Sequence, residues 1–126
     1  EKNNNTDESR LETLSEMMKK FTSHFPQIEV IGSKDMQKVM KEKGKIWIVD
    51  VRNSTEQAVS VIPSSITTAE FDRAVENKSV SLNDLVVPYC TVGYRSGVYA
   101  ESLKNRGFNN VRNGEGILLW TYTDCP

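Results

Sequence analysis

Apolar side chains recur at helical spacing near the start of the chain, after ten residues that contain none. We predict that residues 1–10 form a disordered lead-in, because they hold no apolar residue that could join a core. The next residues predict an amphipathic helix over 11–27, which Pro26 ends. Such a helix either packs against the rest of the chain or binds a partner in a groove. Its apolar positions are Leu11, Leu14, Met17, Met18, Phe21 and Phe25.

From residue 28 onward, short apolar runs alternate with amphipathic stretches. The run at 45–51 is apolar on both faces, which is typical of a parallel strand covered by helices on both sides. The alternation predicts an α/β domain over 28–126, with a mostly parallel five-stranded sheet and helices on both faces. Pro88 is expected near the end of its strand, since it cannot donate to a ladder. The predicted strands are 28–31, 45–51, 65–67, 85–89 and 110–112, and the predicted helices or helical turns are 33–43, 54–60, 68–77, 95–106 and 117–122.

Composition narrows the class of protein. The chain has 126 residues, enough for one domain, and its 16 Lys and Arg nearly balance its 17 Asp and Glu. A net charge of -1 argues against nucleic acid as a partner, and no apolar run is long enough to span a membrane. Two cysteines exclude a disulfide-rich scaffold. We expect the protein to be a soluble monomer that is located in the cytoplasm or in an organelle. Because the sequence starts at Glu1 and not at Met, we also expect a processed form or a fragment.

One segment, residues 89–97, combines the residue types of a reactive thiol site. Cys90 follows a predicted buried strand, and the residues from Arg95 onward open a helix. Backbone N–H groups of the loop, the helix N-terminus and Arg95 would all stabilise an anion there, so we expect the thiol to ionise readily. Gly93 permits a positive φ, and Ser96 is small and can donate a hydrogen bond. A buried structural cysteine beside an ordinary turn is the alternative.

This loop resembles the active loop of the rhodanese-like sulfurtransferases, which begins with cysteine, has glycine at its fourth position and frequently closes with arginine and serine. Cys90, Gly93, Arg95 and Ser96 match that pattern. The resemblance covers about residues 28–126 and implies the rhodanese-like fold. Further matching segments are 48–52 (IVDVR) with Glu56, Ile62-Pro63, Gly107-Phe108, and 114–116 with Trp120.

The resemblance implies a sulfur relay. Cys90 would take a sulfane sulfur from thiosulfate or a persulfide and pass it to cyanide, a thiol or a protein acceptor, with no cofactor. Thr91 stands where enzymes that use thiosulfate well frequently have a basic residue, which favours a persulfide as donor. The segment 61–65 also lacks the histidine and glycine that the family often has around its isoleucine-proline pair. The implied substrate-binding residues are Thr91, Val92, Gly93, Tyr94, Arg95 and Ser96.

Two other functions remain open. A phosphatase or arsenate reductase of the same architecture also places cysteine and arginine around an anion cradle. Four residues separate Cys90 from Arg95. The related phosphatases have five, a wider cradle for a tetrahedral oxyanion, so the count favours sulfur. The other alternative is a non-enzymatic module that binds a partner through its N-terminal helix.

The remaining chemistry-bearing residues favour structural roles. Asp50 and Arg52 end a strand on the side of the loop, and we expect Arg52 to pair with Glu56 and hold the turn. His24 is the single histidine and is expected on the surface of the N-terminal helix, away from the loop, which argues against a Cys-His protease. Cys125 could resolve an oxidised Cys90, although an unpaired terminal cysteine is the simpler interpretation. The sequence has no metal-ligand cluster.

Overall fold

The computed structural model describes residues 7–42 and 46–114, which form five parallel strands and five α-helices. The predicted alternation is confirmed. The parallel strands form two ladders, β3-β2-β4 and β1-β5. A parallel bridge between Val86 and Val111 connects them, and the Val86 N–H donates to the Asn110 carbonyl at 2.9 Å. The strands are β1 (Glu29–Ile31), β2 (Ile46–Asp50), β3 (Ile66–Thr67), β4 (Leu85–Tyr89) and β5 (Arg112–Gly114); the helices are α1 (Asp7–Thr22), α2 (Ser33–Lys41), α3 (Ser54–Val59), α4 (Thr68–Glu76) and α5 (Tyr94–Asn105).

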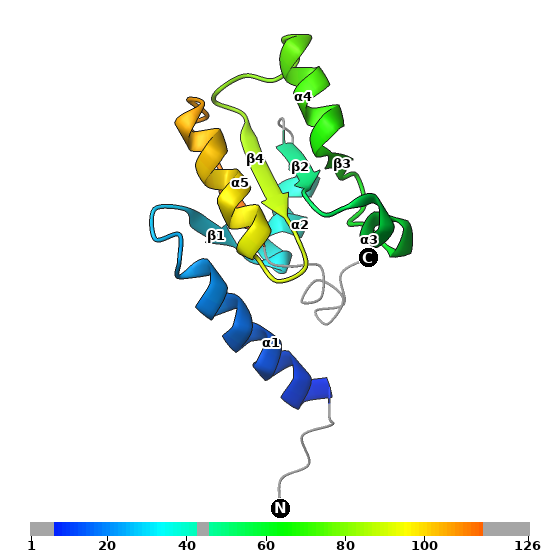
Figure 1. Cartoon of the computed structure of the whole chain (residues 1–126), viewed down its shortest axis with the longest axis vertical. Helices are drawn as coiled ribbons and strands as arrows, with labels where there is room; N and C mark the ends of the chain where they lie inside the picture. The colour runs from blue at the N-terminus through cyan, green and yellow to red at the C-terminus, as the bar shows by residue number, and fades with distance from the viewer. Residues whose placement is uncertain (1–6, 43–45, 115–126) are drawn as a thin grey trace, which may run out of the picture.

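Strands β2 and β4 bury residues on both faces, as their apolar runs predict. Neighbouring residues of a strand point to opposite faces, and β2 and β4 accordingly contribute to two separate apolar clusters. One cluster packs under α4 and α5, and the other packs under α2. Figure 1 shows α5 lying along β4 with α4 near β2 and β3. The first cluster includes Val49, Phe71, Val86, Ala100 and Leu103, and the second includes Met36, Ile48, Ile62 and Val87.

Local signals explain most boundaries. Capping boxes start both α3 and α4, with Asn53 and Thr67 as N-caps. Pro88 pairs with Val49 one residue before the end of β4, where a missing donor disturbs the ladder least. The last described strand lies at Arg112–Gly114 and not at 110–112, so that prediction is wrong by two residues. A Cβ at Gly114 would lie 3.0 Å from Val87, so glycine allows β5 to approach β4 closely.

Helix α1 differs from its prediction at both ends. It begins at Asp7, so residues 7–10 are helical and not part of a disordered lead-in. A helix needs no apolar residue to continue, and acidic residues such as Glu8 suit its N-terminal turn. It ends at Thr22 and not at 27. The Thr22 hydroxyl donates to the Met18 carbonyl, and a turn then brings Phe25 back onto the domain.

The apolar stripe of α1 packs on the domain in its C-terminal half. Met18 and the following Phe25 are each only 5% exposed. Phe25 occupies the space beside Gly97, where a Cβ would approach its ring to 2.3 Å. The other half of α1 extends away from the strands (Figure 1). In the described part of the chain, no helix combines the length and apolar character needed to cross a membrane.

Candidate active site around Cys90

The segment from β4 to α5 forms a tight cradle around one sulfur atom. Cys90 follows the last residue of β4 and is 1% exposed. Gly93 is the N-cap of α5 and adopts a left-handed conformation, with φ of 98°. This conformation strains any residue with a side chain. The predicted need for glycine at this position is confirmed, and the turn carries the chain directly from the sheet edge into the helix.

Backbone groups of the cradle converge on the Cys90 sulfur. The Gly93 N–H donates to Sγ at 3.1 Å, and the Ser96 N–H donates at 3.4 Å. These donors belong to the N-cap and the first turn of α5, so the helix dipole adds to their effect. The Ser96 hydroxyl lies 3.3 Å from the same sulfur. The cradle can therefore accommodate negative charge on Cys90.

A second polar layer lies behind this cradle and was not predicted from the sequence. Asn113 of β5 is 1% exposed. Its amide donates from Nδ2 to the Gly93 carbonyl at 2.9 Å, and its Oδ1 accepts the Ser96 hydroxyl at 2.6 Å. Nothing in the sequence pattern distinguishes Asn113 from its neighbours Asn109 and Asn110. The parallel pairing of β5 brings it to the loop.

Arg95 is engaged with an acidic partner. Its two terminal guanidinium nitrogens, Nη1 and Nη2, donate to the Glu56 carboxylate at 2.8 and 2.9 Å, and Nη2 also donates to the Thr91 hydroxyl. Hydrogen bonds from Arg95 lower the pKa of Glu56 to about 2. Hydrogen bonds to Glu56 in turn raise the pKa of Arg95. The predicted positive charge of Arg95 is therefore present at the loop, but the Glu56 carboxylate of α3 partly neutralises it.

The predicted pairing of Arg52 with the Glu56 side chain is wrong. Arg52 instead forms a buried two-pronged ion pair with Asp50, with a contact of 2.7 Å. Burial acts to raise the pKa of Asp50, but hydrogen bonds from Arg52 and Tyr89 outweigh it and hold that pKa below its ordinary value. The Tyr89 hydroxyl donates to Asp50 at 2.8 Å and accepts the Ile62 N–H at 3.0 Å. This network braces the residue that precedes Cys90.

The other predicted site residues lie on different sides of the loop. Thr91 and Val92 are half-buried, while Tyr94 is 46% exposed. Tyr94 packs in an aromatic cluster with Phe21, His24 and Phe25, with 5.9 Å between its ring and that of His24. His24 is exposed, as expected, but it lies after α1 and beside the loop, which contradicts its predicted separation from the loop. Residues 117–122 and Cys125 lie outside the described residues.

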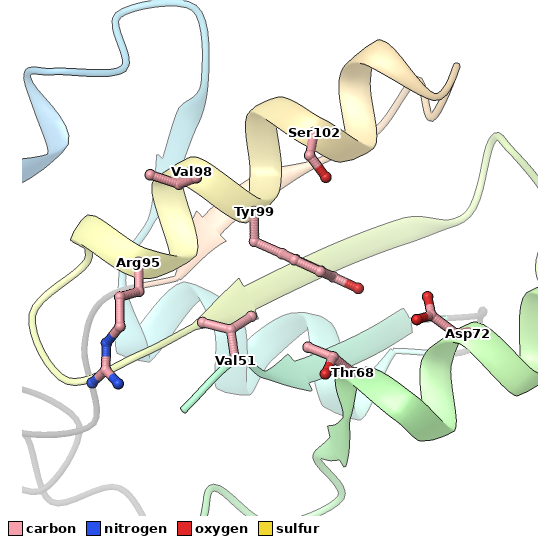
Figure 2. Close-up of a pocket in the computed structure, with 7 residues that line it drawn as sticks. All are labelled: Val51, Thr68, Asp72, Arg95, Val98, Tyr99 and Ser102. Atoms are coloured by element: carbon pink, nitrogen blue, oxygen red, sulfur yellow. The ribbon is translucent and has the colours of Figure 1, made fainter. Parts of the chain in front are cut away.

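A surface hollow of about 430 Å³ opens next to Arg95 and does not include Cys90 (Figure 2). The Tyr99 side chain points from α5 toward α4, and its hydroxyl oxygen is buried without a hydrogen-bond partner. Burial raises the pKa of Tyr99. The hollow lies between Val51, which follows the C-terminal end of β2, and the helices α4 and α5. It is lined by Val51, Thr68, Asp72, Arg95, Val98, Tyr99 and Ser102.

The family model for the Rhodanese-like domain matches residues 33–120, well over half of the chain. The chain belongs to the rhodanese-like family. Its members with solved structures share the fold. A Rhodanese-like domain protein from Staphylococcus aureus is 25% identical, with a TM-score of 0.61 over 74% of this chain and 91% of that chain. The polysulfide-sulfur transferase homodimer from Wolinella succinogenes is 19% identical, with a TM-score of 0.66 over 89% and 86%.

The curated relatives of this chain are not named as sulfurtransferases. A tRNA uridine(34) hydroxylase from Corynebacterium kroppenstedtii is 34% identical over 95 residues, which are 68% of this chain and 31% of that protein. A protein of the same name from Protochlamydia amoebophila is 29% identical over 97 residues. This chain thus spans about a third of the length of these relatives. The name of these relatives includes tRNA, whereas the net charge of -1 of this chain argues against nucleic acid as a partner.

Proposed function

We propose that this rhodanese-like chain is a sulfurtransferase that carries a sulfane sulfur as a persulfide on Cys90. The observation that carries the proposal is the convergence of two backbone N–H groups on the buried Cys90 sulfur at the start of α5. Donors that are already fixed in place stabilise a sulfur anion without reorganisation. In this proposal Cys90 is the nucleophile, and residues 91–96 bind the donor.

The transfer balances without an oxidant or a cofactor. The Cys90 thiolate attacks the outer sulfur of a persulfide donor, the donor's S–S bond breaks, and its electron pair leaves with the donor thiolate. A Cys90 persulfide results. The acceptor, a thiol or cyanide, then attacks the outer sulfur of this persulfide and releases Cys90 as a thiolate. Thiosulfate would react in the same way, with sulfite as the leaving group.

The charge around the loop favours a persulfide over thiosulfate. Thiosulfate is a dianion, whereas the full positive charge nearest the loop, on Arg95, is paired with Glu56. Thr91, which accepts from Arg95 and donates to Glu56, adds no charge. A donor with a single charged sulfur suits such a loop better than a dianion does.

A second candidate function is participation in a reaction on tRNA. The observation that favours it is the 34% identity with a tRNA uridine(34) hydroxylase. The matched segment is about a third of that protein, so the remaining two thirds could hold the RNA-directed activity. Binding of purified tRNA to this chain, measured over a range of salt concentrations, tests the candidate, because phosphate contacts weaken steeply with salt. Absence of salt-sensitive binding would exclude a direct role for this chain in holding tRNA.

Intact-mass analysis tests the sulfur-transfer proposal. The chain is incubated separately with thiosulfate, with a small-molecule persulfide and with an aryl phosphate ester, whose phenolate is the leaving group, and any added mass is mapped by peptide analysis. We expect one added sulfur atom on Cys90 with the persulfide, less with thiosulfate, and its removal by cyanide as thiocyanate. Cys90→Ser should lose the modification and all activity, since a hydroxyl cannot hold a sulfane sulfur, whereas Cys125→Ser should keep both.

Other outcomes favour the alternatives. Sulfur that maps to Cys125 would place the nucleophile elsewhere. A phosphorylated Cys90 would favour the phosphatase alternative. No added mass with any sulfur donor, in a chain that is folded by circular dichroism, would leave the non-enzymatic binding module as the better interpretation.

A further inference from the structure

A chain of hydrogen bonds leads from the Cys90 sulfur back to the loop that encloses it. It runs from Sγ to the Ser96 hydroxyl at 3.3 Å, from there to Asn113 Oδ1 at 2.6 Å, and from Asn113 Nδ2 to the Gly93 carbonyl at 2.9 Å. Cys90, Ser96 and Asn113 are each at most 1% exposed, so bulk water does not supply alternative partners. The direction of every proton in this chain can be assigned.

The assignment starts at the Gly93 carbonyl, which can only accept. The Asn113 NH2 group must therefore face it, and Oδ1 must face Ser96. An amide oxygen cannot donate, so the 2.6 Å contact requires the single hydroxyl proton of Ser96 to point at Asn113. Ser96 consequently presents only lone pairs to the Cys90 sulfur.

This arrangement distinguishes the two protonation states of Cys90. A thiol can donate its S–H to the Ser96 oxygen, which completes the chain. A thiolate would face an oxygen lone pair unless the Ser96 hydroxyl turned toward it. That turn would leave Asn113 Oδ1 buried without a donor, which is unfavourable. The backbone N–H groups of Gly93 and Ser96 favour the anion, and the Asn113 side chain opposes them.

We propose that Asn113 is a positioning residue that holds the Ser96 hydroxyl as an acceptor toward Cys90 and thereby opposes the ionisation of the Cys90 thiol. The proposal rests on the proposed function only in that Cys90 is the reactive group. It concerns the proton of the resting thiol and not the transfer of sulfur, so the two can fail separately.

Charged groups around the site stay the same in the test variants. On α5, Arg95 is the charged residue of the Cys90 loop, and its guanidinium is bonded to the Glu56 carboxylate of α3. The Asp50–Arg52 pair at the end of β2 contacts Tyr89, next to Cys90. On the α1 side, a Cβ at Gly93 would meet the uncharged side chains of Thr22 and Met18, and the titratable His24 packs against Tyr94 of the loop. A shift in the Asn113 variants therefore reports the hydrogen-bond chain.

The test is the rate of Cys90 alkylation by iodoacetamide as a function of pH, followed by mass analysis of the Cys90 peptide in a Cys125→Ser background. Asn113→Ala frees the Ser96 hydroxyl to donate to the thiolate. We expect the midpoint of the rate profile to fall and the rate below that midpoint to rise about fivefold. In a Ser96→Ala background, Asn113→Ala should have no such effect. Asn109→Ala, on an exposed asparagine bonded to Asn83, is the matched control.

Three results would overturn the proposal. The Asn113→Ala profile could be unchanged, or its midpoint could rise. It could also shift equally in the Ser96→Ala background, which would mean that Asn113 acts through the Gly93 carbonyl. Circular dichroism and thermal unfolding establish whether each variant is folded. If Asn113→Ala is not folded, Asn113→Leu, which preserves more of the side-chain volume, is used in its place. The assay needs no sulfur donor, so its outcome stands whether or not Cys90 forms a persulfide.

Discussion

Two arginine–carboxylate pairs flank the same loop, and their surroundings give them different roles. The Asp50–Arg52 pair has side chains 2% and 5% exposed, and its other partners are Tyr89 and backbone carbonyls. The Glu56–Arg95 pair has side chains 32% and 45% exposed. When a buried ion pair loses one member, the remaining charge stays uncompensated in the interior. When an exposed pair loses one member, water solvates the remaining charge. The first pair therefore holds the end of β2, and we propose that the second, being exposed, exchanges partners with an anionic sulfur donor.

The largest expected effect is on the buried pair. Arg52→Met should lower the free energy of unfolding by about 3–5 kcal/mol, because Asp50 would remain buried without its cation. Denaturant unfolding measures this, with Arg73→Ala on the exposed surface of α4 as the control. A loss below about 1 kcal/mol would show that the two pairs do not differ in the way their burial indicates.

Loss of the exposed arginine should reduce activity with little effect on stability. Arg95→Met is expected to change the free energy of unfolding by less than about 1 kcal/mol. It should slow sulfur transfer from a persulfide about tenfold or more, since a charged contact to the anionic donor is lost. Unfolding and cyanolysis assays on the same preparation measure both. A variant that is much less stable yet transfers sulfur at the normal rate would contradict the comparison.

The smallest effect is the acid dependence of the exposed pair. Glu56 has a folded-state pKa of about 2 against an ordinary 4.5, so its contribution to stability is complete above 4.5 and is lost as the pH falls toward 2. The difference in melting temperature between the wild type and Glu56→Gln should shrink over that window. Glu76→Gln, on an exposed residue of α4, serves as the control. A difference that stays constant down to about pH 2 would mean that Glu56 does not owe its stabilising effect to its charge.

Local patterns predicted the frame of this protein well. The apolar runs located β2 and β4, and helical spacing located α2 and α4, because each depends on residues close together in the sequence. Gly93 and its positive φ followed from the same local reasoning. The errors lie at element ends, as in α1 and β5, where packing against distant residues decides how far an element continues.

The sequence by itself determined that a strand, a tight turn and a helix would enclose Cys90, since that geometry depends on nine consecutive residues. Only the tertiary structure decided the partners of that loop. Glu56 reaches Arg95 across 39 positions, and Asn113 reaches Ser96 across 17. The parallel strands bring these residues to one edge, and a single polar residue in a strand or short helix carries no periodic signal of the contact it will make. The pairing of charges and the direction of protons at Cys90 are therefore properties of the fold.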